Sequence, residues 1–325
     1  MKNVFLLVGI MLVALVAGCS RFDIELPEID SPESTIYVTH LKENAITALD
    51  ITNGSQKKTN LPFRFSSIVE IEPGYLLASV KEEEQLFEIN IKDGKITPFV
   101  DIEQGVIELV YDLENRLIYA ANGKSNRISV IDMEEKKAVK EIEVGEYPSK
   151  MFLDGDRLYV LTSGSGEVYV LDTATYEVTG SFSVNARPEG LHFDGTYIWT
   201  GGHGGAGEMN GKVFAYDPET GKEMKSVNTG LMPIHILQNS PDSPLFVLSH
   251  GDHSLTKINA ETYKVEEKIE VCDNPSYMIA DKQSLYISCL DGDELLMVNQ
   301  DKVNIMNRYK ISNGPFLLFK GGDEE

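Results

Sequence analysis

Seven short apolar runs in this chain each end in an aspartate or asparagine, at nearly constant intervals. These markers are Asp50, Asn90, Asp132, Asp172, Asp217, Asn259 and Asn299, and the intervals between them are 40, 42, 40, 45, 42 and 40 residues. A second marker follows sixteen residues after each one, and in the last five repeats it is a proline: Pro148, Pro188, Pro233, Pro275 and Pro315. Repeats of this length, built from short alternating segments, predict a β-propeller with one four-stranded blade per repeat.

The repeat around Asp172 illustrates the expected blade. β-Branched and aromatic residues predict strands over residues 149–153, 157–162, 167–172 and 177–183, with Gly and Asp in the turns between them. The first strand is the most apolar and is expected innermost, and the last is the most polar and is expected outermost. Every repeat also keeps an apolar residue three positions after the proline slot, which predicts a core between blades: Val69, Leu109, Met151, Leu191, Ile236, Met278 and Leu318.

The two ends of the repeat array predict how the ring closes. The first repeat begins at a second strand, residues 36–39, whereas the chain ends on an innermost-type strand, residues 315–319. The fold class expected is therefore all-β: a seven-bladed propeller of four-stranded antiparallel blades. Its first blade takes one strand from the C-terminus and three from the N-terminal side, which removes unpaired sheet edges.

Several short motifs resemble the YVTN-type β-propeller repeats of bacterial and archaeal surface and periplasmic proteins. Tyr37-Val38-Thr39 is the literal motif, with His40 where the family favours Asn, and Tyr119-Ala120-Ala121-Asn122 keeps that Asn. Residues 128–132 (ISVID), with Gly145 and Pro148 downstream, match the rest of the pattern. The resemblance covers about residues 35–320 and implies a binding or surface protein, since the family has no shared catalytic set.

The N-terminus predicts export and a lipid anchor. Lys2 precedes an apolar stretch that is too short to span a bilayer as a mature helix, and Val16-Ala17-Gly18-Cys19 resembles a bacterial lipobox. We expect a lipoprotein signal peptide over residues 1–18, a lipidated Cys19 with a tether to residue 34, and the propeller over residues 35–325. The alternative is an ordinary secretory signal with an incidental cysteine. Whether the anchor would lie in an inner or an outer membrane is left open.

The net charge indicates which classes of partner the protein is expected to bind. A net charge of −22 at pH 7 repels phosphate backbones, so nucleic acid is not expected as a partner. Solubility on an exposed extracytoplasmic surface explains the acidity more simply than an acidic recognition surface does.

Two sets of loops are expected on one face of the disc, namely the proline turns and the connections between second and third strands. Four residues that each lie just before a proline are expected to form a ligand or partner face: Tyr147, Arg187, Met232 and Asn274. The connections hold four of the six histidines, and His203, His250 and His253 with Asp252 are predicted as a site for a divalent metal, zinc or copper. The alternative is that exposed loops carry such residues without binding anything.

Further residues leave alternatives open. The glycine-rich stretch 201–211 is either a flexible lip over the central channel or a tolerated insertion. His192 and His235, on innermost strands, are expected to be hydrogen-bonded structural histidines. Cys272 and Cys289 are either a disulfide or two free buried thiols.

No local catalytic signature is present, since the chain lacks G-x-S-x-G, C-x-x-C-H and a P-loop. We expect a lipid-anchored lipoprotein on the extracytoplasmic side of a bacterial membrane. Its expected function is to bind a protein, an envelope polymer or a small ligand. The one cofactor considered is a divalent metal, and otherwise none is expected. The alternative is a metal protein, or an enzyme of hydrolase or oxidoreductase type, with its site in the propeller mouth.

Overall fold

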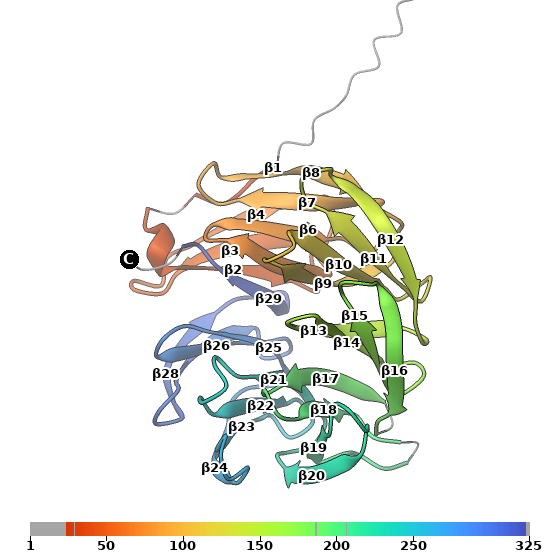
Figure 1. Cartoon of the computed structure of the whole chain (residues 1–325). Coiled ribbons are helices and arrows are strands. Elements are labelled where there is room, and N and C mark those ends of the chain that lie inside the picture. The colour runs from red at the N-terminus through yellow and green to blue at the C-terminus, as the bar shows by residue number, and fades with distance from the viewer. Residues whose placement is uncertain (1–23, 29, 186, 206, 323–325) are drawn as a thin grey trace, which may run out of the picture.

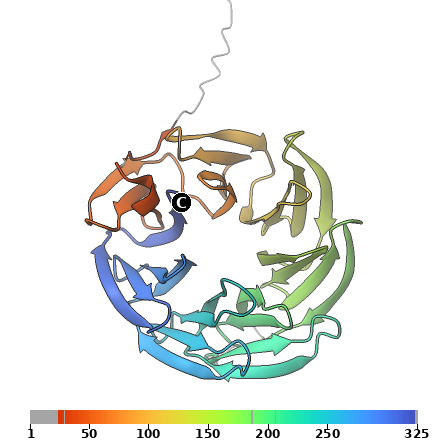
Figure 2. The same cartoon turned by 60° about the vertical axis from the view of Figure 1, so that its left-hand side comes forward.

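The computed structural model describes residues 24–28, 30–185, 187–205 and 207–322, and it confirms a seven-bladed β-propeller. Seven antiparallel sheets follow one another around a ring, and the chain colour runs once around it (Figure 1, Figure 2). The predicted signal peptide and the lipidation site Cys19 lie outside the described residues.

Each blade has its innermost strand next to the axis and its most polar strand at the rim. Blade 1 contains β29 (Pro315–Lys320), β2 (Thr35–His40), β3 (Ala45–Asp50) and β4 (Gln56–Asn60). Blade 2 contains β5 (Ser67–Glu72), β6 (Tyr75–Ser79), β7 (Gln85–Asn90) and β8 (Lys95–Asp101). Blade 3 contains β9 (Val106–Asp112), β10 (Leu117–Asn122), β11 (Arg127–Asp132) and β12 (Lys137–Glu143).

The remaining four blades repeat this order. Blade 4 contains β13 (Pro148–Asp154), β14 (Arg157–Thr162), β15 (Glu167–Asp172) and β16 (Glu177–Ser183). Blade 5 contains β17 (Pro188–Phe193), β18 (Ile198–Gly202), β19 (Lys212–Tyr216) and β20 (Glu223–Asn228). Blade 6 contains β21 (Pro233–Leu237), β22 (Leu245–Ser249), β23 (Ser254–Ile258) and β24 (Val265–Glu270). Blade 7 contains β25 (Pro275–Ala280), β26 (Ser284–Cys289), β27 (Glu294–Asn299) and β28 (Asn304–Lys310).

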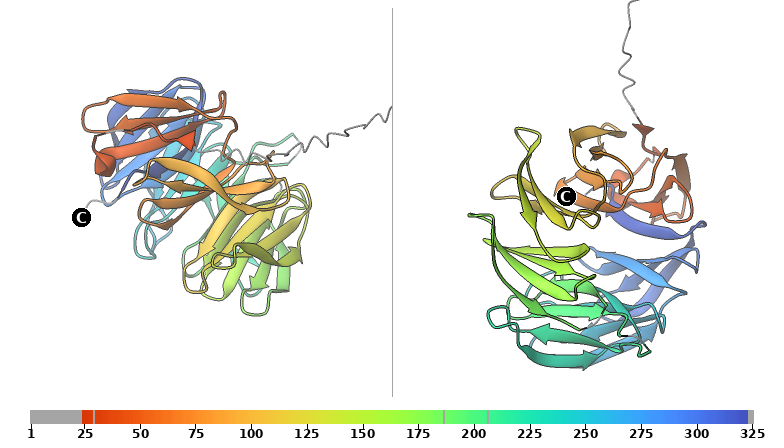
Figure 3. Two further views of the ribbon diagram at one scale, coloured as in Figure 1. Left: turned by 90° about the horizontal axis from the view of Figure 1, so that it is seen from above. Right: turned by 90° about the vertical axis from the view of Figure 1, so that its right-hand side faces the viewer.

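The ring closes as the sequence predicts. β29 pairs with β2 in antiparallel register, with Tyr37 opposite Phe319 and Val38 opposite Leu318. In both views of Figure 3 the blue C-terminal strand lies beside the red and orange strands of blade 1. Closure therefore joins the two ends of the repeat array within one sheet.

The repeated aspartate or asparagine is explained by the turn that follows the third strand. In every blade its side-chain oxygen accepts a backbone N–H two or three residues ahead. The donors are Thr52, Asp93, Glu134, Thr175, Thr220, Thr262 and Lys302, at 2.8 to 3.0 Å. Such turns favour short side chains with an acceptor oxygen, and this accounts for the period in the sequence.

The core lies between the blades. Six of the seven apolar residues predicted for it, from Leu109 onward, are buried, and Val69 is partly buried. The second strands are the most enclosed, and β2, β10, β22 and β26 have every residue buried. The innermost strands contact one another in sequence around the axis, so that side chains from different blades meet there.

The segment expected to be a tether contains regular structure. β1 (Ile24–Glu25) pairs with the outer strand β8, and Leu26 packs into the core that blades 1 and 2 share, before η1 (Pro32–Ser34) leads into β2. Apolar residues at 24 and 26, together with an unpaired sheet edge, explain this docking. No helix within the described ranges has the length and hydropathy needed to cross a membrane.

Candidate functional site

Backbone hydrogen bonds place the proline turns and the connections between second and third strands on one face, here called the loop face. In blades 4 to 7 the residue after the second strand donates its N–H to the carbonyl of the residue before the proline. These pairs are Ser163 to Tyr147, His203 to Arg187, His250 to Met232 and Leu290 to Asn274, at 2.9 to 3.2 Å. The four residues predicted for a ligand or partner surface therefore occupy equivalent positions on neighbouring blades.

All four of these residues adopt the left-handed backbone conformation. Their φ angles are 54° at Tyr147 and Arg187, 56° at Met232 and 51° at Asn274. L-residues pay roughly 1–2 kcal/mol for this conformation, which is why glycine usually fills it. Gly105 and Gly314 do so at the corresponding turns of blades 3 and 1. Side chains are thus retained on blades 4 to 7 at a cost in stability.

A hydrogen bond between neighbouring blades, here called the latch, holds several of these turns. The N–H of Tyr147 donates to Asn126 Oδ1 of the preceding blade at 3.0 Å, and that of Asn274 donates to His253 Nδ1 at 3.1 Å. Gly314 donates in the same way to Asp293. The acceptor residues share one position in their loops, so the latch is a repeated device of the propeller.

The latch determines what His253 can do. Because its Nδ1 accepts the Asn274 amide, the ring proton is assigned to Nε2. A metal on Nε2 would require the proton on Nδ1, where it would face another donor. His253 therefore has a structural bond that competes with the metal role predicted for it.

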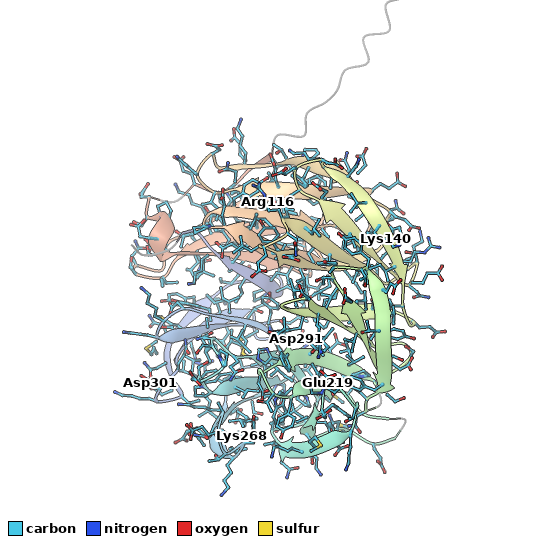
Figure 4. The ribbon with its side chains drawn as sticks, in the orientation of Figure 1. Arg116, Lys140, Glu219, Lys268, Asp291 and Asp301 are labelled. Carbon is cyan, nitrogen blue, oxygen red and sulfur yellow. A yellow bond between two sulfur atoms is a disulfide. The ribbon has the colours of Figure 1, made fainter. Side chains whose placement is uncertain are left out.

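Asp252 is also engaged. Its carboxylate accepts the Ser254 hydroxyl at 2.8 Å and pairs with Lys268 Nζ at 2.7 Å. Lys268 lies on the outer strand β24 and is labelled in Figure 4. The Lys268 ion pair therefore competes with metal binding by Asp252.

His203 and His250, by contrast, meet directly. Their ring centroids are 4.9 Å apart and their planes are inclined by 67°. His250 Nε2 is buried and has no hydrogen-bond partner. Burial and then the neighbouring His203 lower the pKa of His250, so its ring is neutral at pH 7. Of the four side chains predicted to bind metal, these two are the pair that the fold brings together.

The glycine-rich loop closes over its own base beside this pair. The Asn210 N–H donates to the carbonyl of His203, and the Asn210 carbonyl accepts the N–H of Met232 from blade 6. The Asn210 side chain also donates to the carbonyls of Gly202 and Lys212. These bonds fix the backbone on both sides of His203, while Met209 at the loop tip is 63% exposed.

The two cysteines are joined in the structure. Cys272 and Cys289 form a disulfide with their Cα atoms 5.9 Å apart, linking the connection after β24 to the second strand of blade 7. With Glu294 they make up the one group of three potential ligands that comes within 4.8 Å among the residues described. Bonded sulfurs are not thiolates, so this group is not a metal site.

A second cluster, which the sequence reasoning missed, lies on the axis and comes from five successive blades. We call Glu108, Lys150, Glu189, His235 and Tyr277 the axial cluster. Lys150 Nζ lies 3.0 Å from Glu108 Oε2, and the charge of Lys150 also affects His235 and Tyr277 on blades 6 and 7. The sequence contains a signal for this cluster, because charged residues are unexpected on innermost strands.

Burial is the largest single influence on the shifted pKa values in the axial cluster. Burial raises the pKa of Glu108, and Lys150 offsets only part of this shift. Burial opposes the charge of Lys150 too, but Glu108, with smaller contributions from Tyr277 and Glu189, raises the pKa of Lys150 above its usual value. Burial, then Lys150 and His192, lower the pKa of His235 to about 3.

The histidines on the innermost strands make structural contacts. His192 Nε2 lies 3.1 Å from Gln238 Oε1, and its ring packs edge-on against Phe152. His235 Nδ1 accepts the Met278 N–H at 3.3 Å, and its ring lies 4.8 Å from that of Tyr277. Both form the hydrogen bonds expected of structural histidines.

Comparison with known proteins shows the fold and no more. No family model matches the chain, and no curated protein matches it. Among solved structures, a functionally unknown protein from Desulfotomaculum acetoxidans is similar, with a TM-score of 0.73 and 11% identity over 90% of this chain and 100% of that one. The dihydro-heme d1 dehydrogenase NirN, in complex with DHE, is similar with a TM-score of 0.63 and 11% identity over 91% and 77%. A chain of the mitotic checkpoint complex has a TM-score of 0.64 and 11% identity over 74% and 78%.

Proposed function

We propose that this protein is a lipid-anchored binding module of a bacterial cell envelope, a lipoprotein member of the YVTN-type propellers. Its loop face would take a protein, an envelope polymer or a small ligand. The observation that carries the proposal is the row of four left-handed residues with retained side chains on blades 4 to 7. Strain kept at equivalent positions on one face is typical of sites under functional constraint.

The chemistry of this row suits a mixed contact surface. Tyr147 is 40% exposed and Arg187 is exposed, and these two residue types are enriched where proteins bind one another. Asn274 is held by the Asp291 carboxylate at 2.9 Å, which also pairs with Lys42 of blade 1. Asp291, labelled in Figure 4, thereby extends the face from blade 7 to blade 1.

The docked N-terminal segment supports a position close to the membrane. Four residues separate Cys19 from Ile24, the first residue paired to blade 2. Five backbone steps span at most about 18 Å, so an acylated Cys19 would keep the rim of blade 2 near the bilayer.

Site-specific photo-crosslinking in intact cells tests the proposal. A photoreactive amino acid at Tyr147 or Arg187 is expected to give a discrete adduct. The matched control is Leu113, which is 72% exposed in the turn at the opposite end of β9. Adducts from Leu113 alone, or from no position, would contradict a binding role for the loop face.

A second experiment tests the anchor separately. Replacing Cys19 by Ser is expected to move the protein from the membrane fraction to a soluble extracytoplasmic fraction. Unchanged membrane association of Cys19→Ser would contradict the lipoprotein assignment. Either proposal can therefore fail without the other.

A further inference from the structure

Blades 5 and 6 differ from the other blades at one position of the loop face. The residue directly after the second strand is His203 in blade 5 and His250 in blade 6. The equivalent residues of the other blades offer no side chain that binds metals strongly: Leu41, Val80, Gly123, Ser163 and Leu290. The two histidines are therefore adjacent because their blades are adjacent, and each backbone is fixed by a hydrogen bond to a proline turn.

The spacing of the two rings matches that of two imidazoles on one metal ion. With Zn–N bonds of about 2.0–2.1 Å and a tetrahedral angle, the ring centres of two such ligands lie about 5 Å apart. The observed separation is 4.9 Å.

His250 Nε2 also has an unmet requirement for a partner. It is buried without a hydrogen bond, and leaving such an atom unpaired costs roughly 1–3 kcal/mol. A ligand at this atom would remove that cost. Each of the other four histidines in the described part of the chain has a ring nitrogen in a hydrogen bond.

Glu189 supplies a carboxylate on the axial side of the pair. It follows Pro188, whose partner in the sheet is Gly202, the residue directly before His203. Glu189 therefore lies at the loop-face end of β17, the innermost strand of blade 5, next to the connection that holds His203. Within the described ranges the Glu189 side chain makes no hydrogen bond or ion pair, unlike that of Asp252.

We propose that His203, His250 and Glu189 bind a divalent transition-metal ion of the zinc class at the mouth of the propeller. Two imidazoles and one carboxylate favour such an ion over Mg²⁺ or Ca²⁺, which take oxygen ligands. The three ligand atoms do not all lie within 4.8 Å of one another, so Glu189 or His203 rotates its side chain to complete the site. The remaining coordination position would take water or an anionic group of a bound partner.

Zinc titration of the full-length protein in detergent, after treatment with a chelator, tests the site. Calorimetry is expected to show one Zn²⁺ per chain with micromolar or tighter affinity. Co²⁺ is expected to give visible absorption bands from a site with nitrogen and oxygen ligands. His203→Gln and His250→Gln each weaken zinc binding by at least about 100-fold, and Glu189→Gln by about 10-fold or more.

Matched variants separate this site from the neighbouring residues. Asp252→Asn, which removes the charge held by Lys268, is expected to bind zinc as the unmodified protein does. No heat at micromolar zinc overturns the proposal, as does unchanged binding by His203→Gln or Glu189→Gln. A loss confined to Asp252→Asn would place the metal at the other carboxylate and also overturn it. Thermal unfolding in chelator identifies any variant that has simply lost its fold, and His203 lies on a loop where such loss is not expected.

Discussion

Tyr37 and Phe319 stack face to face across the closure of the ring, with ring centroids 4.9 Å apart and planes inclined by 9°. They are direct register partners between β2 and β29, and each is 5% exposed. A stacked pair contributes about 0.5–1.5 kcal/mol beyond the area it buries. The two ends of the propeller are thus joined by side-chain packing as well as by backbone hydrogen bonds.

Phe319→Ala is expected to lower the free energy of unfolding by about 3–5 kcal/mol, since it leaves a cavity beside Tyr37. Urea unfolding followed by fluorescence measures the change. Leu113→Ala is the control, because Leu113 is exposed and its truncation is expected to change stability by less than about 0.5 kcal/mol. Equal effects of the two substitutions would show that the closure contributes little.

Removing residues 313–325 tests the same closure more severely. Without β29 the strand β2 presents an unpaired edge, and we expect the protein to unfold or to oligomerise. Size-exclusion chromatography and circular dichroism distinguish these outcomes. A truncated chain that stayed a folded monomer would disprove the role of β29.

The enclosed His235 predicts that stability falls on acidification. Its pKa is about 3 in the folded protein, against 6.5 for a fully solvated histidine, so below pH 6.5 the unfolded chain takes up a proton that the folded chain does not. The contribution of His235 to the free energy of unfolding is complete above pH 6.5. As the pH falls from 6.5 toward 3, the free energy of unfolding is expected to fall by about 1 kcal/mol per pH unit. Unfolding in urea at pH 6.5, 5.5 and 4.5 measures this slope.

His235→Gln is expected to remove about 1 kcal/mol per pH unit from this slope, which is the part that one proton contributes. Tyr277→Phe keeps the ring beside His235 and is expected to leave the slope unchanged. Identical slopes for the unmodified protein and His235→Gln would show that this histidine does not titrate as described.

Much of the fold follows from the sequence because each blade has the same local requirements. Asp172 and its equivalents accept amides in the turn after the third strand, and Pro148 and its equivalents begin the innermost strands. Both requirements are met within a few residues of the chain. The same residue types therefore recur at a nearly fixed spacing in the sequence. The closing strand could be predicted for the same reason, since residues 315–319 match the other innermost strands.

The axial cluster could not be predicted in this way. Lys150 and Glu108 are 42 residues apart and lie on different blades, so their contact depends on how side chains meet at the axis. The hydrogen bond that His253 accepts and the ion pair that Asp252 forms likewise depend on donors from another blade or another strand. The pairing of β1 depends on an edge that β8 offers, for which residues 24–26 carry no local signal beyond two apolar side chains.

Arg187→Gly is expected to stabilise the fold by up to about 1 kcal/mol while weakening capture of the partner. Glycine relieves the left-handed backbone at φ 54°, and the gain is limited by the greater freedom of glycine in the unfolded chain. Glu177→Gly, in the extended outer strand β16, is the control and is expected to destabilise. Stability is measured in urea, and partner capture by crosslinking from Tyr147. A variant with higher stability and undiminished crosslinking would show that Arg187 is kept for another reason.

Leu26→Ala is expected to release the N-terminal segment from blade 2 without unfolding the propeller. Leu26 is 6% exposed in the core shared by blades 1 and 2, and its N–H donates to the Gly94 carbonyl at 2.8 Å. Losing about 2 kcal/mol of local packing would speed amide exchange at residues 24–26 by about 10- to 100-fold, because each 1.4 kcal/mol corresponds to a factor of ten. Hydrogen exchange read by mass spectrometry measures this, with Val139→Ala on the exposed rim strand β12 as control. Unchanged exchange at residues 24–26 would mean that the pairing of β1 does not depend on Leu26, and the short distance between Cys19 and the rim would then rest on backbone pairing alone.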